Sequence, residues 1–140
     1  MKVNVITLVL SLAATMTTAA AVPDVDTGNA TTIVVGGQRG EARCETSGRS
    51  PGVSNIAVGA NELRDKGNDS CYHDGGSKTQ MVHRNGIRIY LMGRAGSAPC
   101  RVAADKLATL MAECAAEVDG DIRAGGTIDL IPGTYIQVSQ

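Results

Sequence analysis

Four cysteines are the residues of this chain with the clearest chemistry. They are Cys44, Cys71, Cys100 and Cys114. An even number of cysteines in a chain that enters an oxidising compartment predicts disulfides, here two. A zinc site is the alternative, but it would use closely paired C-x-x-C cysteines, and this sequence has no such pair. Four cysteines allow three pairings, and their number alone does not choose among them.

Catalytic and metal-binding chemistry find little support in the remaining residues. The two histidines, His73 and His83, lie in a predicted loop and a predicted turn, so we expect both to be solvated. Ser70 and Ser77 flank His73, but a hydrolase needs its nucleophile, base and orienting group in one pocket. The acidic residues between positions 117 and 121 fit a solvated helix end better than a metal site. We therefore predict no enzyme activity, no metal site and no cofactor.

Basic side chains surround a predicted central hairpin. They are Lys78, His83, Arg84 and Arg88. Strand alternation places Arg88 on the face opposite Ile87 and Ile89. A cationic surface of this kind can contact an acidic channel mouth or receptor, so Lys78, Arg84 and Arg88 are the predicted target-binding residues. The alternative is a solvated strand edge whose charges prevent aggregation.

Residues 1–21 have the pattern of a secretory signal peptide. Lys2 precedes an apolar run from Val3 to Ala14, and the small residues Ala19–Ala21 follow. The apolar run is shorter than the roughly 20 residues that a membrane-spanning helix needs. We predict cleavage after residue 21, an extracellular location and no stable insertion into a membrane.

The rest of the chain has the composition of one small domain with few aromatic side chains. Loss of Lys2 changes the net charge from −1 to about −2, which argues against a nucleic-acid partner. The sequence contains no Trp, no Phe and three Tyr. Each disulfide would therefore matter to stability, at about 2–4 kcal/mol. Asn29 and Asn68 begin N-x-Ser/Thr sequons and are candidate glycosylation sites.

Apolar periodicity predicts two helices. The first follows Pro51 and ends before Gly67, and its apolar stripe is interrupted by Gly59. The second begins at Pro99–Cys100 and has its apolar residues, through Cys114, on one face. Asp119–Gly120 close this helix or the turn after it.

The strands are predicted from alternation and turn signals. Residues 79–82 and 87–91 form a hairpin around an Asn-Gly turn, and residues 67–79 are expected to be a loop. Residues 127–131 and 134–138 form either two strands or one interrupted strand. Together the elements predict an α+β protein: a two-layer α/β sandwich with an antiparallel sheet and both helices on one face.

Several of these segments resemble the killer protein 4 family of small fungal toxins. The matching segments are Arg43–Gly48, Met81–Leu91, Cys100–Cys114 and Gly125–Leu130. They are similar to the family's opening cysteine with its Ser/Gly segment, its central hairpin, its second helix with a cysteine at each end, and a late strand. The resemblance covers about residues 43–138.

The resemblance implies a two-layer sandwich and, among the three possible pairings, Cys44–Cys114 and Cys71–Cys100. The family usually has more cysteines than this chain, and Gln80 stands where an important lysine of the best-known member lies.

The resemblance also implies a function. We expect a secreted killer-toxin-like protein that perturbs target cells by binding a membrane protein, for which a calcium channel is the candidate. The alternative is a secreted effector that binds a host target without antifungal activity. The expected organisation is a signal peptide (1–21), an N-terminal arm (22–42) in which residues 32–35 form an edge strand or an ordered arm, and a monomeric toxin-like domain (43–140).

Overall fold

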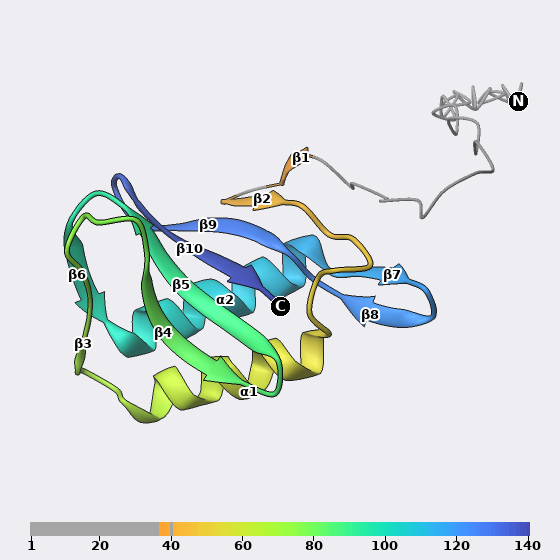
Figure 1. Ribbon diagram of the computed structural model, residues 1–140, viewed down its shortest axis with the longest axis horizontal. Helices are drawn as coiled ribbons and strands as arrows, with labels where there is room; N and C mark the ends of the chain where they lie inside the picture. Colours follow the sequence, from red (N-terminus) through yellow and green to blue (C-terminus); the bar gives the residue numbers. More distant parts are fainter. Residues whose placement is uncertain (1–36, 40) are drawn as a thin grey trace, which may run out of the picture.

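A six-stranded antiparallel sheet forms the centre of the protein in the computed structural model, which describes residues 37–39 and 41–140 (Figure 1). In spatial order its strands are β1 (Gly37–Arg39), β2 (Ala42–Cys44), β9 (Gly126–Ile131), β10 (Thr134–Ser139), β5 (Ile87–Gly93) and β4 (Thr79–Arg84). The predicted signal peptide, the candidate glycosylation site Asn29 and residues 32–35 lie outside the described residues. In this strand order β10 lies inside the sheet, between β9 and β5.

Two helices and two small strand pairs complete the described part of the chain. The helices are α1 (Val53–Asp65) and α2 (Cys100–Cys114). The strand pairs are β3 (Ser70–His73) with β6 (Gly96–Pro99), and β7 (Ala116–Val118) with β8 (Asp121–Arg123). The helices pack against each other and cover one side of the sheet (Figure 1). The predicted α+β class is confirmed.

The domain boundary in the sequence prediction falls inside the sheet. β1 and Ala42 belong to the segment predicted as the N-terminal arm, yet β2 pairs with β9 through the register Ala42↔Ile128 and Cys44↔Gly126. The sheet thus extends into the predicted arm.

The first helix forms because its apolar residues recur on one face. Ile56, Ala60 and Leu63 are buried, and they point towards the sheet and the second helix. Gly59 lies on the same face, where a Cβ atom would be 2.7 Å from Cδ1 of Ile89. The glycine that interrupts the apolar stripe therefore lets the helix approach the sheet closely.

The second helix begins where the sequence predicts and ends at Cys114, the last residue of its apolar stripe and five residues before Asp119. Pro99 is its N-cap residue, and Ala103, Leu107 and Leu110 are completely buried. Proline suits this position because a helix start does not need the missing N–H.

Two hairpins correct the sequence prediction. β4 continues through Arg84, so the turn that joins it to β5 contains only Asn85 and Gly86, with φ values of 50° and 77°. Positive φ at both residues is typical of the tight turn favoured between twisted strands. The acidic residues 117–121 lie in the β7–β8 hairpin and not at a helix end, because α2 already ends at Cys114.

The loop prediction for residues 67–79 is wrong in its first half. Residues 70–73 form β3, in which Cys71 and His73 are buried while Ser70 and Tyr72 are exposed. Alternation is therefore present, but the buried positions are a cysteine and a histidine, which do not give an apolar signal.

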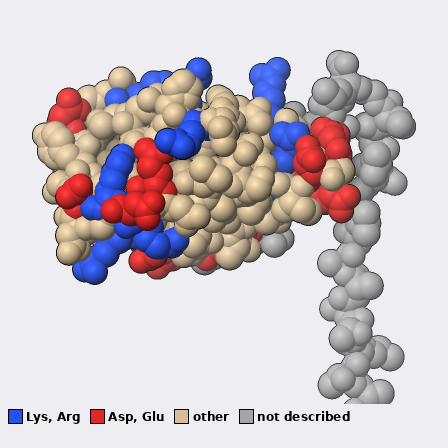
Figure 2. Space-filling model, turned by 90° about the horizontal axis from the view of Figure 1, so that it is seen from below, with Lys and Arg blue, Asp and Glu red and all other residues tan. Residues whose placement is uncertain are grey.

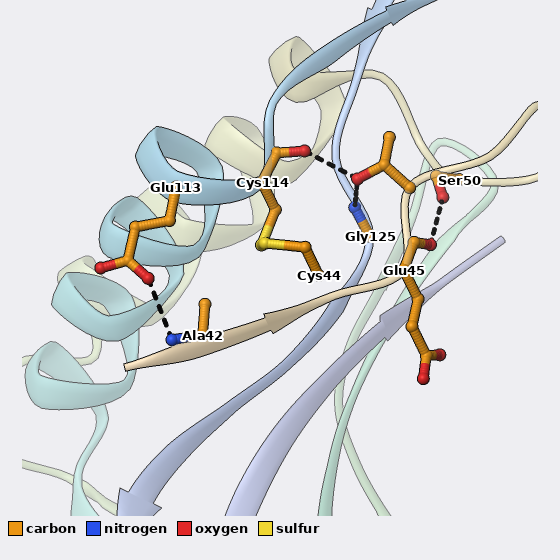
Figure 3. Close-up of a disulfide and its surroundings, with 8 residues drawn as sticks. Ala42, Cys44, Glu45, Ser50, Glu113, Cys114 and Gly125 are labelled. Carbon is orange, nitrogen blue, oxygen red and sulfur yellow. Dashed lines mark hydrogen bonds between the residues drawn. A yellow bond between two sulfur atoms is a disulfide. The ribbon is translucent and has the colours of Figure 1, made fainter. Parts of the chain in front are cut away.

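The core is aliphatic and is closed by two disulfides, Cys44–Cys114 and Cys71–Cys100. This is the pairing that the family resemblance implied. Beside the first disulfide, the buried hydroxyl of Thr46 donates to the Cys114 carbonyl at 2.7 Å and accepts from the Gly125 amide at 3.1 Å (Figure 3). These bonds satisfy backbone groups at the end of α2 and the start of β9 that water cannot reach.

Candidate functional site

The side of the sheet that faces away from the helices is the candidate functional site, and we call it the outer face. Ile87 and Ile89 of β5 point towards α1, since their Cδ1 atoms lie next to Gly59. Side chains of a strand alternate between faces, so Arg88 and Tyr90 belong to the outer face.

Lys78 and Tyr90 form the centre of this site. The Nζ atom of Lys78 lies 4.5 Å from the centre of the Tyr90 ring, within the range of a cation–π contact. Tyr90 is only 8% exposed although it is on the outer face. Its cross-strand neighbours are Gln80 on β4 and Gln137 on β10. The ring therefore holds the lysine ammonium group above a surface of neutral polar side chains.

Arg88 extends the positive charge along the same strand. It is exposed, and its cross-strand partner on β4 is His83, which is also exposed. Among the ion pairs of the described residues, none includes Lys78 or Arg88. Both cations are thus available to a partner. We call Lys78, Arg88 and Tyr90 the basic surface.

Arg84, the third predicted target-binding residue, lies elsewhere. It is the cross-strand partner of Ile87, and its Nε atom is 3.3 Å from Oε2 of Glu62 on α1. Arg84 and Glu62 line a shallow hollow of about 290 Å³ together with Val58, Asn61 and Asp65. The structure therefore brings Lys78 and Arg88 to one face and directs Arg84 towards the helix side.

The helix side carries charge of both signs. Figure 2 views the molecule from below Figure 1 and shows basic and acidic side chains interleaved near one end, a second charged group at the other end, and uncharged surface between them. The ion pairs Arg64–Asp105 and Lys66–Glu62 belong to this mixed-charge side. Such a surface has less selectivity for an acidic partner than the basic surface.

The prediction that both histidines are solvated is wrong for His73. Its side chain is 0% exposed, with Nδ1 2.8 Å from Oγ1 of Thr79 and Nε2 3.2 Å from the Gly93 carbonyl oxygen. His73 is the last residue of β3, and alternation along this strand places its side chain on the buried face. There it contacts the start of β4 and the end of β5. His73 joins these strands, whereas His83 is exposed on β4 as expected.

The described ranges, 37–39 and 41–140, contain no group of three or more His, Cys, Asp or Glu residues that could hold a metal ion. The same ranges contain no helix that is long and apolar enough to cross a membrane. Asn68, the second candidate glycosylation site, is exposed just after α1.

Two outer-face residues were not named as site residues from the sequence. Strand alternation places Tyr90 on the same face as Arg88, but nothing in the sequence shows that Lys78 lies over its ring. Arg43 is exposed on β2 between the buried residues Ala42 and Cys44, and it adds a cation at the far side of the sheet. Its position could not be found without the pairing of β2 with β9.

In comparisons with known proteins, no protein-family model, curated protein or solved structure matches this chain.

Proposed function

We propose that this protein is exported and acts as a killer-toxin-like protein, which perturbs a target cell by binding an acidic site on a membrane protein through its basic surface. The observation that carries the proposal is the placement of Lys78 and Arg88 on one open sheet face without an acidic partner in the described residues. Unpaired cations on a rigid face steer an acidic partner and fix its orientation.

Two further observations support an extracellular binding role. Two disulfides join the two ends of α2 to β2 and β3, and disulfides persist in oxidising compartments. The sequence also begins with a signal-peptide pattern. The toxin class and a calcium channel as target come from the resemblance to the killer protein 4 family.

The test compares growth and calcium uptake of several fungal species treated with three oxidised proteins: the parent, Lys78→Glu/Arg88→Glu, and Arg49→Glu/Arg101→Glu. The control pair is exposed and lies in a loop and on α2, and it changes the net charge equally. We expect the parent to inhibit growth and reduce calcium uptake. The basic-surface variant should lose at least tenfold in potency, and the control should stay within twofold of the parent.

Each other outcome has a definite meaning. A parent protein that leaves growth and uptake of all species unchanged at high dose contradicts the toxin proposal. Activity on host tissue instead, with the same dependence on Lys78 and Arg88, would support the alternative of a host-directed effector. Equal losses in both variants would show that net charge, and not the basic surface, determines activity.

A further inference from the structure

A groove separates the free edges of two strands, β3 and β4. Within the described residues β3 pairs only with β6, and β4 is the last strand of the six-stranded sheet (Figure 1). The groove has a volume of about 360 Å³. Its two walls are Ser70, Cys71 and Tyr72 of β3, and Thr79, Gln80 and Met81 of β4.

The backbone of β3 presents hydrogen-bonding groups to this groove. The Cys100 amide donates to the Asp69 carbonyl at 2.9 Å, so Asp69 faces the β6 side. In an antiparallel pair, successive residues direct their N–H and C=O groups alternately towards and away from the partner strand. The N–H and C=O groups of Ser70 and Tyr72 therefore point away from β6 and into the groove.

This edge of β3 is held rigidly in place. The disulfide to Cys100 fixes the strand at Cys71, and the buried His73 fixes its end through hydrogen bonds to Thr79 and Gly93. A partner would therefore lose little free energy in ordering the strand when it binds.

The groove also selects side chains. Its floor is apolar, because Cys71 and Cys100 are 6% and 2% exposed and Met81 is half-buried. Its rim is polar, charged and aromatic, with Lys66, Asp69 and Gln80 exposed and Tyr72 57% exposed. An extended chain that lay in the groove would place alternate side chains on the floor and at the rim.

We propose that this groove binds an extended segment of a partner polypeptide, with alternating apolar and polar side chains, as a strand added to the free edge of β3. The segment would pair with the backbone of Ser70 and Tyr72 and cover the Tyr72 ring. This mode of recognition uses main-chain hydrogen bonds for affinity and the side-chain floor for selectivity. The groove wall is about three residues long, or roughly 10 Å, so only two or three residues of the partner segment can pair with it. The proposal goes beyond the basic surface and does not depend on it.

The experiment uses a phage-displayed library of random dodecapeptides selected on the oxidised full chain. Binding of the selected peptides is then measured with the parent, Tyr72→Thr and Tyr72→Pro. Both variants lack the ring, but only proline lacks the outward N–H, and proline is tolerated at such an edge position. We expect Tyr72→Thr to weaken binding a few-fold and Tyr72→Pro to weaken it at least tenfold more. The amides of Ser70 and Tyr72 should exchange rapidly in the free protein and become protected in the complex.

Three results would overturn the proposal: no peptide is enriched, the enriched peptides leave the Ser70 and Tyr72 amides unprotected, or the two variants bind equally well. If Tyr72→Pro does not fold, amide protection in the parent decides the outcome. Peptide binding by Lys78→Glu/Arg88→Glu should equal that of the parent, so this proposal and the proposed function can fail separately.

Discussion

At the scale of single residues, His73 is a buried polar side chain that links two strands through hydrogen bonds. Its ring is buried, and its two nitrogens contact Thr79 at the start of β4 and Gly93 at the end of β5. A buried polar group is stabilising only while its partners are present, because each orphaned group retains its desolvation cost.

We predict that His73→Ala lowers the free energy of unfolding by about 2–4 kcal/mol, because it leaves a cavity and deprives the Thr79 hydroxyl and the Gly93 carbonyl of a partner. His83→Ala is the matched control, since His83 is exposed, and it should change stability by less than about 0.5 kcal/mol. Urea unfolding of the oxidised proteins measures both. Similar losses for the two variants would contradict the structural role given to His73.

At the scale of elements, the contact between α1 and the sheet depends on Gly59. Glycine inside a helix is about 0.5–1 kcal/mol less favourable than alanine. A Cβ atom at this position would nevertheless lie 2.7 Å from Cδ1 of Ile89 and 3.1 Å from Cδ1 of Ile87, and both isoleucines are buried. Overpacking of this kind costs about 1–3 kcal/mol, so close packing outweighs helix propensity here.

Gly59→Ala should therefore destabilise the protein by about 1 kcal/mol, although alanine favours the helix. Ile89→Val removes the nearest methyl group, so the double variant should lose less stability than the sum of the two single variants. Thermal unfolding of all four proteins gives the coupling energy. Additive losses, or a stabilised Gly59→Ala, would show that α1 can shift away from the sheet at no cost.

The elements also show where sequence patterns suffice. The start and the buried face of the second helix follow from the sequence because the start signal at Pro99–Cys100 and the apolar stripe agree. The pattern does not fix where the helix ends between Cys114 and Asp119. β3 was missed because its inward residues, Cys71 and His73, are buried through a disulfide and hydrogen bonds and not through apolar character. In the site, alternation located Arg88 correctly, but the separation of Arg84 from Lys78 required knowledge of where α1 presents Glu62.

At the scale of the whole molecule, the two disulfides constrain very different lengths of chain. Cys44–Cys114 closes a separation of 70 residues and Cys71–Cys100 one of 29. The larger loop also contains α1, the central hairpin and all of α2. Its closure should remove more entropy from the unfolded chain.

Replacement of Cys44 and Cys114 by alanine should therefore cost more stability than replacement of Cys71 and Cys100. The chain-entropy relation gives about 4.4 kcal/mol for the first pair and about 3.6 kcal/mol for the second. The Thr46 hydrogen bond to the Cys114 carbonyl adds to the first loss, because it depends on that end of α2. Urea unfolding of the two double variants tests the order, and the reverse order would contradict it.

The position of β10 has a consequence for how this chain is made. Thr134–Ser139 lies between β9 and β5, so until it is present the sheet consists of two separate halves, β1–β2–β9 and β5–β4. β9 and β5 cannot be joined into one sheet before β10, which pairs with both of them, has been synthesised. The six-stranded sheet can therefore form only after Thr134–Ser139 has been synthesised and is free to pair, and a premature stop codon before position 134 would abolish the native state instead of trimming it.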